Sequence, residues 1–138
     1  MIAVDTNILV RYAVKDDPKQ TILATSFLEE NHCFFSKTVL LELIWVLSSK
    51  NAYNLSRDAV VERVKHIIGL PNITTENVEH FAQALAWYQS GMDFADSLHL
   101  IGSENLSSFA TLDKRMLKKA NDIGVKQDII LLKQTSIN

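Results

Sequence analysis

The sequence contains a single cysteine, Cys33, among its 138 residues, so no disulfide can form within the chain. The near absence of cysteine is typical of proteins from a reducing compartment, and a cytoplasmic location is expected. Cys33 lies in an apolar stretch, where we expect it to be a small buried side chain.

The sequence also lacks a dominant charge and a long apolar run. Its 14 basic and 16 acidic residues give a net charge of −2, so no strong basic field attracts nucleic acid over long range, although local patches remain possible. No apolar run reaches the ~20 residues needed to span a bilayer. The N-terminus shows no basic flank of a signal peptide. A soluble intracellular protein is expected.

The composition is that of a folded globular domain. Hydrophobic residues make up 47% of the chain and charged residues 22%, which argues against disorder. No repeat, low-complexity tract or linker divides the sequence. We therefore expect one domain, residues 1–138, that buries about two-thirds of its unfolded surface.

Short β-prone runs alternate with helical patterns along the chain. Strands are predicted at residues 2–4, 33–35, 72–74, 107–112 and within 125–132, the first of them buried. Helices are predicted from Thr6, from Pro18, and at residues 36–50, 57–68, 76–89, 93–103 and 113–121. This alternation predicts an α/β sandwich around a mostly parallel sheet. Residues 133–138 are expected to be frayed.

Three of these helices have a predicted apolar face. The expected inward residues are Ile22, Leu23, Phe27 and Leu28 in the helix from Pro18, Val60, Val61, Val64, Ile67 and Ile68 in the helix at 57–68, and Val78, Phe81, Ala82, Leu85 and Trp87 in the helix at 76–89.

Four acidic residues stand apart from the solvated ones. Glu42 interrupts the apolar run TVLLELIWVL, and a lone ionised glutamate is costly to bury without compensation. Asp5 and Asp113 each follow a predicted strand, so they are expected at the edge of the sheet where parallel strands end. Glu42 and Asp96 lie near helix starts and could share that rim. Carboxylates gathered there would repel one another, and Mg²⁺ or Mn²⁺ would remove the conflict because both prefer oxygen ligands.

Each acid also has a purely structural alternative. Asp5 and Asp113 could cap the helices that follow them, and Glu42 could face water on an amphipathic helix, in a semi-polar stripe bordering a cleft. Asp93 lies one turn before Asp96, and this spacing favours a helix cap for Asp93 and a ligand role for Asp96.

The same set of residues resembles the PIN domain family, and specifically the VapC-type toxin nucleases. The matching stretches are IAVDTNILVRY, TVLLELIWVL, DFADSLHLIG and SSFATLDKRML. They occur in the family's order and at its usual separations, and they cover essentially the whole chain. The resemblance implies a PIN-like α/β/α sandwich, with a small and mostly parallel sheet flanked by helices.

The resemblance implies a ribonuclease dependent on Mg²⁺ or Mn²⁺. Its acidic quartet would be Asp5, Glu42, Asp96 and Asp113, of which Asp5 and Asp96 match the pair most directly associated with the metal. Further matched positions are Thr6 and Asn7 of the DTN signature, Thr111 before the last acid, and Asp93 as a secondary candidate. The family also implies an RNA substrate, a toxin role, a homodimer, and a cognate antitoxin that blocks the active-site groove.

Local cations are needed if a chain of net negative charge is to bind RNA. A bound metal ion partly cancels the charge, and Arg11, Lys114 and Arg115 are candidate phosphate contacts. A solvated helix face is an equally good explanation for the basic cluster after Asp113. His99 is expected to pack on its helix, since metal-assisted hydrolysis needs no histidine base.

Two other functions remain open from the sequence. A receiver or phosphatase-like domain also places acids around Mg²⁺, but DTN lacks the second aspartate two residues on, and no paired acid precedes Asp5. A non-catalytic PIN-like binding module is the other alternative, and the intact quartet argues against it. Trp45, Trp87 and Tyr88 are candidate contacts for a dimer partner or an antitoxin.

Overall fold

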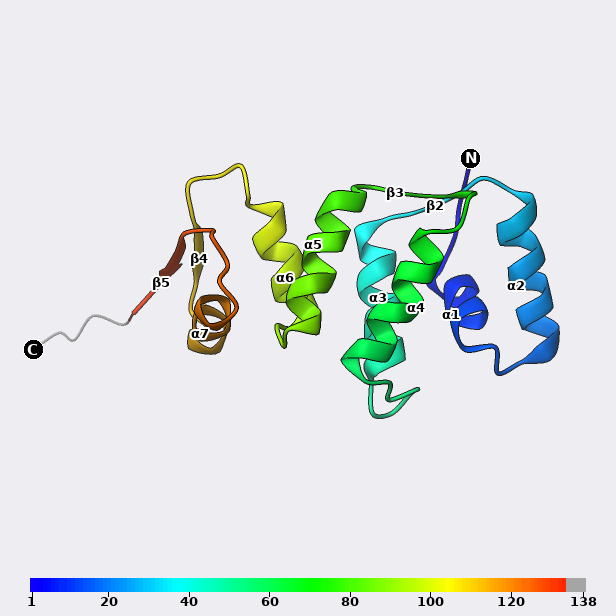
Figure 1. Cartoon of the computed structure of the whole chain (residues 1–138), viewed down its shortest axis with the longest axis horizontal. Helices are drawn as coiled ribbons and strands as arrows, with labels where there is room; N and C mark the ends of the chain where they lie inside the picture. Colours follow the sequence, from blue (N-terminus) through cyan, green and yellow to red (C-terminus); the bar gives the residue numbers. More distant parts are fainter. Residues whose placement is uncertain (134–138) are drawn as a thin grey trace, which may run out of the picture. The chain divides into compact units, whose positions relative to one another are not determined.

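The computed structural model describes residues 1–133 and divides into two compact units, residues 1–78 and 79–138 (Figure 1). A single domain over the whole chain therefore stays a prediction. Residues 134–138, most of the stretch expected to be frayed, lie outside the described residues. The predicted α/β class with a small, mostly parallel sheet flanked by helices is confirmed, and every strand pair in the described part of the chain is parallel. The strands form two separate sheets, whereas a single sheet was expected.

The first unit contains a parallel sheet in the order β1-β2-β3. Its elements are β1 (Ile2–Ala3), α1 (Thr6–Val14), α2 (Pro18–Glu30), β2 (Cys33–Phe35), α3 (Lys37–Ser48), α4 (Arg57–Ile68) and β3 (Ile73–Thr75). Cys33 pairs with Ile2 on one side and Ile73 on the other, so β2 is the central strand. As predicted, Cys33 is buried.

Local sequence chemistry explains where these helices begin. Ser36 and Ser56 accept a hydrogen bond from the amide three residues later, which satisfies one free donor at the start of α3 and α4. Asp17 caps α2 in the same way, and Pro18 occupies its first turn, where a missing N–H costs nothing. Helix α1 contacts α2, α3 and α4, so it lies inside this group of helices.

Two burial predictions in the first unit are only partly right, since Val4 and Leu28 are buried as expected but other residues of the same sets are not. Strand β1 is not buried, since Ile2 is 44% exposed; β1 is an edge strand that pairs only with β2. In α2 the buried residues are Ala24 and Leu28, whereas Ile22 and Leu23 are 65% and 71% exposed. The stripe at Val60, Val61, Val64 and Ile67 of α4 is buried as predicted, and Ile68 is half-buried.

The second unit contains the parallel pair β4-β5. Its elements are α5 (Val78–Gln89), which begins at the boundary, α6 (Phe94–Gly102), β4 (Phe109–Thr111), α7 (Lys114–Asp122) and β5 (Ile129–Leu131). The core cluster is formed by Met92, Leu100, Met116 and Ala120, with Trp87 and Phe109 packed against it. Gly124 has a φ of 76°, a conformation that suits glycine and ends α7.

The predicted face of α5 is only partly right. Phe81 and Leu85 are buried and Trp87 is partly buried, but Val78 is 55% exposed and Ala82 is also exposed. The face that the structure buries instead includes Ala84 and Tyr88.

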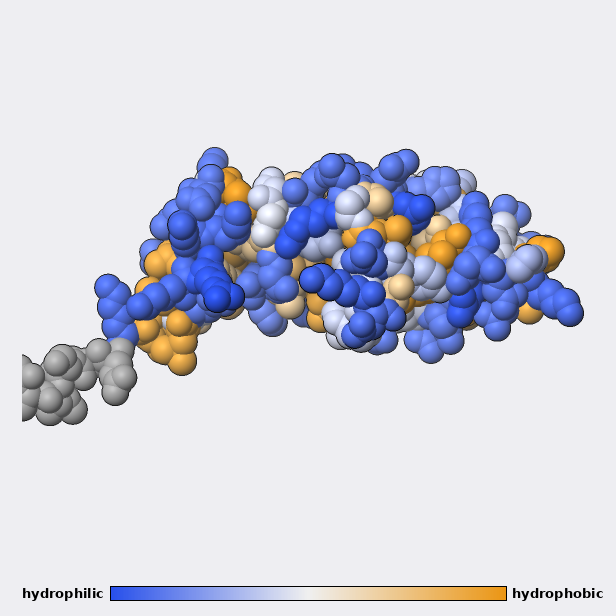
Figure 2. All heavy atoms as spheres, turned by 90° about the horizontal axis from the view of Figure 1, so that it is seen from below, coloured by the Kyte–Doolittle hydropathy of each residue, from blue (hydrophilic) through white to orange (hydrophobic). Residues whose placement is uncertain are grey.

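On the face drawn in Figure 2, the surface of the described residues is mostly hydrophilic, with separate hydrophobic patches. Among residues 1–133, no helix combines the length and the apolar character needed to cross a bilayer.

Candidate functional site

A pocket of about 330 Å³ in the first unit brings Asp5 and Glu42 together. Asp5 lies between β1 and α1, whereas Glu42 comes from the middle of α3. The other lining residues are Thr6, Asn7, Val10, Arg11, Val46 and Tyr53. The structure therefore joins two of the four predicted acids with both polar residues of the DTN signature and with Arg11.

A larger cavity lies elsewhere and has a different lining. It occupies about 680 Å³ in the second unit, beside α5 and the segment after α7, and Glu104 is the one carboxylate in its wall. The smaller pocket gathers two carboxylates with the polar side chains of Thr6 and Asn7, a richer set of oxygen ligands for a divalent cation, so we regard it as the functional one.

Asp5 caps α1 and keeps one carboxylate oxygen available. Its Oδ1 accepts a hydrogen bond from the amide of Thr6 at 2.7 Å. Within the described residues no hydrogen bond is formed by its Oδ2. The structural alternative for Asp5, a helix cap, is thus correct, and it is compatible with a second role as a ligand.

The hydroxyl of Thr6 is buried in the wall of this pocket without a hydrogen-bond partner. Thr6 is 6% exposed, and its Oγ1 is the one buried side-chain polar atom in residues 1–133 that no protein group satisfies. An unpaired buried hydroxyl costs about 1–3 kcal/mol. Asp5, Asn7 and Glu42 line the same pocket, so carboxylate and amide side chains with oxygen atoms, which a hard cation prefers, share it with this hydroxyl.

Glu42 is exposed although its neighbours in the sequence are apolar, so its carboxylate is not buried. Helix α3 buries Leu40, Leu43, Ile44 and Leu47, and Glu42 lies on the opposite side at the pocket. Its apolar neighbours therefore do not bury the charge of Glu42, and its role as a metal ligand stays a prediction. The amphipathic alternative is correct, because water solvates the carboxylate at the edge of the pocket.

The second unit brings Asp93, Asp96 and Asp113 into electrostatic contact. Asp93 is the N-cap of α6, and its Oδ1 accepts a hydrogen bond from the amide of Asp96 at 3.1 Å. Burial raises the pKa of Asp96, and the charges of Asp93 and Asp113 raise it further, while His99 lowers it. The favoured cap role of Asp93 is confirmed. Asp96, whose pKa is raised, is thus the residue of this pair for which a ligand role is expected.

Asp113 caps α7, and Thr111 fixes the turn that presents it. The Oδ1 of Asp113 accepts hydrogen bonds from the amides of Arg115 and Met116, at 2.9 and 3.3 Å. The Thr111 hydroxyl accepts one from the Asp113 amide at 3.0 Å. Asp113, like Asp5, thus uses one carboxylate oxygen for its helix and leaves the other available.

The four predicted acids are distributed over both units. Asp5 and Glu42 belong to the first unit, and Asp96 and Asp113 belong to the second. Within either unit, the described residues hold no group of three or more His, Cys, Asp and Glu side chains that could bind a metal ion. The complete quartet therefore stays a prediction.

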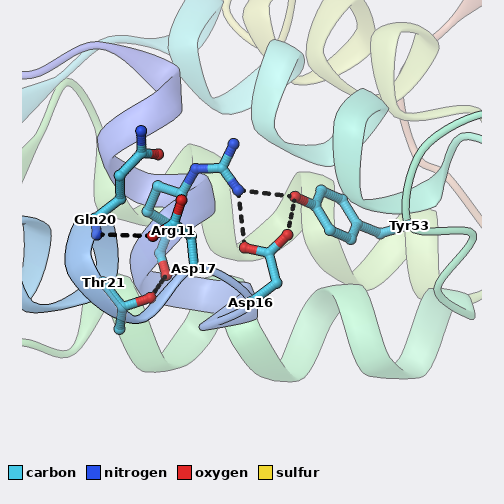
Figure 3. Close-up of polar contacts among 6 residues, drawn as sticks. All are labelled: Arg11, Asp16, Asp17, Gln20, Thr21 and Tyr53. Carbon is cyan, nitrogen blue, oxygen red and sulfur yellow. Dashed lines mark hydrogen bonds and ion pairs between the residues drawn. The ribbon is translucent and has the colours of Figure 1, made fainter.

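Sequence reasoning missed two residues beside the pocket, Asp16 and Tyr53. The Nη1 of Arg11 donates to Oδ1 of Asp16 at 2.8 Å and to the hydroxyl of Tyr53 at 3.2 Å. The same hydroxyl donates to Oδ2 of Asp16 at 2.8 Å, which closes a three-residue network (Figure 3). No sequence signal identifies this network, because Tyr53 lies in the loop after α3 and meets Arg11 only in the folded chain.

The pKa directions agree with a charged pair and a neutral phenol. The hydrogen bond to Asp16 raises the pKa of Arg11 and also that of Tyr53. Hydrogen bonds from Tyr53 and then from Arg11 lower the pKa of Asp16. The network therefore persists across the neutral pH range.

The remaining predicted residues lie on α6 and α7. Lys114 and Arg115 are exposed at the start of α7, which suits either a phosphate contact or a solvated face. The ring of His99 stacks on Phe109 with centroids 6.3 Å apart, in agreement with its expected packing role.

A sequence model of the PIN domain matches residues 2–122, and so covers most of both units. Comparison with curated proteins gives no match.

Proposed function

Because the chain belongs to the PIN domain family, whose members are generally metal-dependent nucleases, we propose that it is an endoribonuclease that hydrolyses RNA phosphodiester bonds. The observation that carries this proposal is the pocket in which Asp5 and Glu42 meet beside the unpaired hydroxyl of Thr6. Its oxygen donors suit Mg²⁺ or Mn²⁺, the cofactors of the proposal.

We assign the metal ligands to the acidic quartet. Asp5 and Asp113 each have a carboxylate oxygen beyond their helix caps, and Glu42 is open to solvent. Asp96 is the acid whose ionisation the protein disfavours, so a cation would relieve its repulsion from Asp93 and Asp113. When bound, the ion supplies an activated water and neutralises charge on the phosphate.

The neighbouring residues position these acids and the substrate. Thr6 and Asn7 place a hydroxyl and an amide beside Asp5, and the Thr111 hydroxyl holds the amide of Asp113. Arg11 lines the pocket together with Asp5 and Glu42 and is a candidate for a phosphate contact there. Lys114 and Arg115 are candidate contacts on the second unit.

The decisive experiment is cleavage of total cellular RNA, with the cut sites mapped. We expect the parent protein to cut in Mg²⁺ or Mn²⁺ and to be inactive in EDTA. Asp5→Asn and Asp96→Asn should each lose at least about 100-fold in rate, since a ligand is removed in each. Asp17→Asn is the matched control, because asparagine preserves the cap of α2 and Asp17 does not line the pocket. Equal cutting in EDTA, or full activity of Asp5→Asn, would contradict the proposal.

Two alternatives are outcomes of related assays. RNA binding without cleavage would indicate a non-catalytic PIN-like module. Transfer of phosphate from a small phosphodonor to Asp5 would indicate a receiver or phosphatase-like domain.

We further propose that the chain is the toxin of a toxin–antitoxin pair, acts in the cytoplasm, and forms a homodimer. Trp45 supports a protein interface, because it is 68% exposed on α3, the helix that also carries Glu42. Of the three aromatic candidates, Trp87 is partly buried and Tyr88 is buried, so Trp45 is the one available for such a contact. Co-expression with the product of an adjacent short reading frame, followed by purification of a complex, would test the antitoxin.

A further inference from the structure

The guanidinium of Arg11 is held by two side chains, only one of which belongs to the pocket. Arg11 and Tyr53 line the pocket with Asp5 and Glu42, whereas Asp16 does not line it. Arg11 thus lines the pocket of Asp5 and Glu42, while its guanidinium is bonded to the carboxylate of Asp16.

The hydrogen bonds use one end of the guanidinium and leave the other free. Both bonds leave from Nη1, to Asp16 and to Tyr53. In Figure 3 the second terminal nitrogen of Arg11 points away from both partners. Arginine has five N–H donors, so Nη2 and Nε can still donate to the two oxygens of a phosphate.

The backbone of Arg11 is fixed as well. The Thr21 hydroxyl of α2 donates to the Arg11 carbonyl at 3.4 Å, and the Lys15 amide bonds to the same carbonyl at 3.1 Å. An arginine held in place loses less conformational entropy when it binds a ligand than a free one does.

Without a bound metal ion, the pocket needs such a cation if it is to accept an anion. Asp5 and Glu42 repel a phosphate, and Arg11 is the one cationic side chain among the lining residues. A freely moving arginine would be attracted to those carboxylates. Bonds to Asp16 and Tyr53 oppose that movement and keep the guanidinium at the wall.

We propose that Asp16 and Tyr53 are positioning residues that hold Arg11 as the phosphate-binding side chain of the Asp5–Glu42 pocket. The inference rests on the proposed function, because it takes RNA as the ligand. It adds Asp16 and Tyr53 to the proposed site. Neither belongs to the acidic quartet, and both act on the substrate only through Arg11.

The test measures binding of a short fluorescent single-stranded RNA to the full chain in EDTA, by anisotropy over a range of salt concentrations. We expect Arg11→Ala to weaken binding at least about tenfold, because the charge-assisted contact of the guanidinium with a phosphate is lost. It should also reduce the slope of log K against log salt by about 0.7, as one phosphate contact disappears. Arg11→Lys keeps the charge but lacks the bidentate geometry of the guanidinium. Its salt dependence should match that of the parent, but it should recover only part of the affinity lost in Arg11→Ala.

Asp16→Asn separates positioning from simple charge. The variant makes the chain one unit more positive, so electrostatics alone predicts tighter RNA binding. Our proposal predicts the opposite, a loss of about threefold, with a similar loss for Tyr53→Phe. Asp17→Asn adds the same charge at the next position and retains its cap, and it should bind at least as well as the parent.

Double variants show whether the residues act through Arg11. In the Arg11→Ala background, Asp16→Asn should cause no further loss of binding. Tighter binding by Asp16→Asn would mean that Asp16 competes with phosphate and would overturn the inference. Absence of binding by the parent, or additive losses in the double variant, would overturn it too.

The cleavage assay distinguishes this failure from failure of the proposed function. If the parent protein cuts RNA and Asp16→Asn binds RNA as tightly as the parent, the inference about Asp16 and Tyr53 is wrong but the nuclease proposal stands. If the parent protein does not cut RNA but the Arg11, Asp16 and Tyr53 variants bind RNA as expected, the nuclease proposal is wrong and the inference stands.

Discussion

The hydroxyl of Tyr12 lies 2.8 Å from Nε2 of His66, and the two rings stack with centroids 5.7 Å apart. Tyr12 belongs to α1 and His66 to the last turn of α4. The pair therefore connects α1, the helix that carries Thr6, Asn7 and Arg11, to α4, against which it packs.

Tyr12→Phe should lower the free energy of unfolding by about 1 kcal/mol, since the ring stays and a largely buried hydrogen bond is lost. Denaturant unfolding at neutral pH measures the change. A cycle with His66→Ala should show coupling between the two sites. Equal stability of Tyr12→Phe and the parent would show that the hydrogen bond contributes nothing.

Tyr12 also predicts the alkaline limit of stability. Burial raises its pKa above the ordinary value of 10.0, with a further contribution from Glu29. The unfolded chain therefore ionises first, so the stabilisation is complete below pH 10 and is lost as pH rises through the folded pKa. Tyr12→Phe should lose less stability than the parent between about pH 9 and 11. A parallel decline of both proteins would exclude Tyr12 as the cause.

Asp96→Asn should stabilise the metal-free protein. Burial and two neighbouring carboxylates raise the folded pKa of Asp96 above the unfolded value of 3.8. The ionised group consequently opposes folding at neutral pH, and this penalty fades as pH falls through the folded pKa toward 3.8. In EDTA at pH 7 we expect a rise of roughly 1–3 °C in the unfolding midpoint.

The same variant should respond less to metal. Mg²⁺ stabilises whichever state binds it, so the parent midpoint should rise with Mg²⁺ concentration, and that of Asp96→Asn should rise less. Asp17→Asn, which keeps its cap and lies outside both acidic groups, should follow the parent. A less stable Asp96→Asn in EDTA would show that its position at the start of α6 outweighs the repulsion.

Sequence reasoning succeeded where the cause is local. Ser56 precedes a helical pattern and caps α4, and Pro18 can occupy only the first turn of a helix. Asp93 and Asp113 cap their helices for the same reason. These features depend on neighbours within four residues, which the sequence displays directly.

It failed where the cause lies in the tertiary arrangement. Ile2 is exposed because β1 is at the edge of its sheet, and strand order is not visible in a strand's own residues. Tyr53 meets Arg11 because the loop after α3 folds back beside α1. Glu42 suggested a buried charge because its neighbours are apolar, yet α3 turns that position to solvent.

Thr6→Val tests whether the unpaired hydroxyl is kept for a cation. Valine matches threonine in shape and removes the buried polar atom, so in EDTA the variant should be as stable as the parent or up to about 1 kcal/mol more stable. The stabilisation that Mg²⁺ gives the parent should be smaller in Thr6→Val. Thr21→Val is the matched control: its hydroxyl donates to Arg11, so it should lose stability and keep the metal response.

Trp45→Ala tests the proposed homodimer. An exposed tryptophan buried in an interface is a typical hot spot, worth about 2 kcal/mol or more, so the dimer dissociation constant should rise at least about tenfold. Sedimentation velocity over a range of concentrations measures that constant. Leu23→Ala is the control, because Leu23 is 71% exposed on α2 and is not assigned to the interface. If Trp45→Ala dimerises like the parent, the interface lies on another face. If the parent is monomeric at all concentrations, the homodimer itself is wrong, and the exposed Trp45 is then left for the antitoxin.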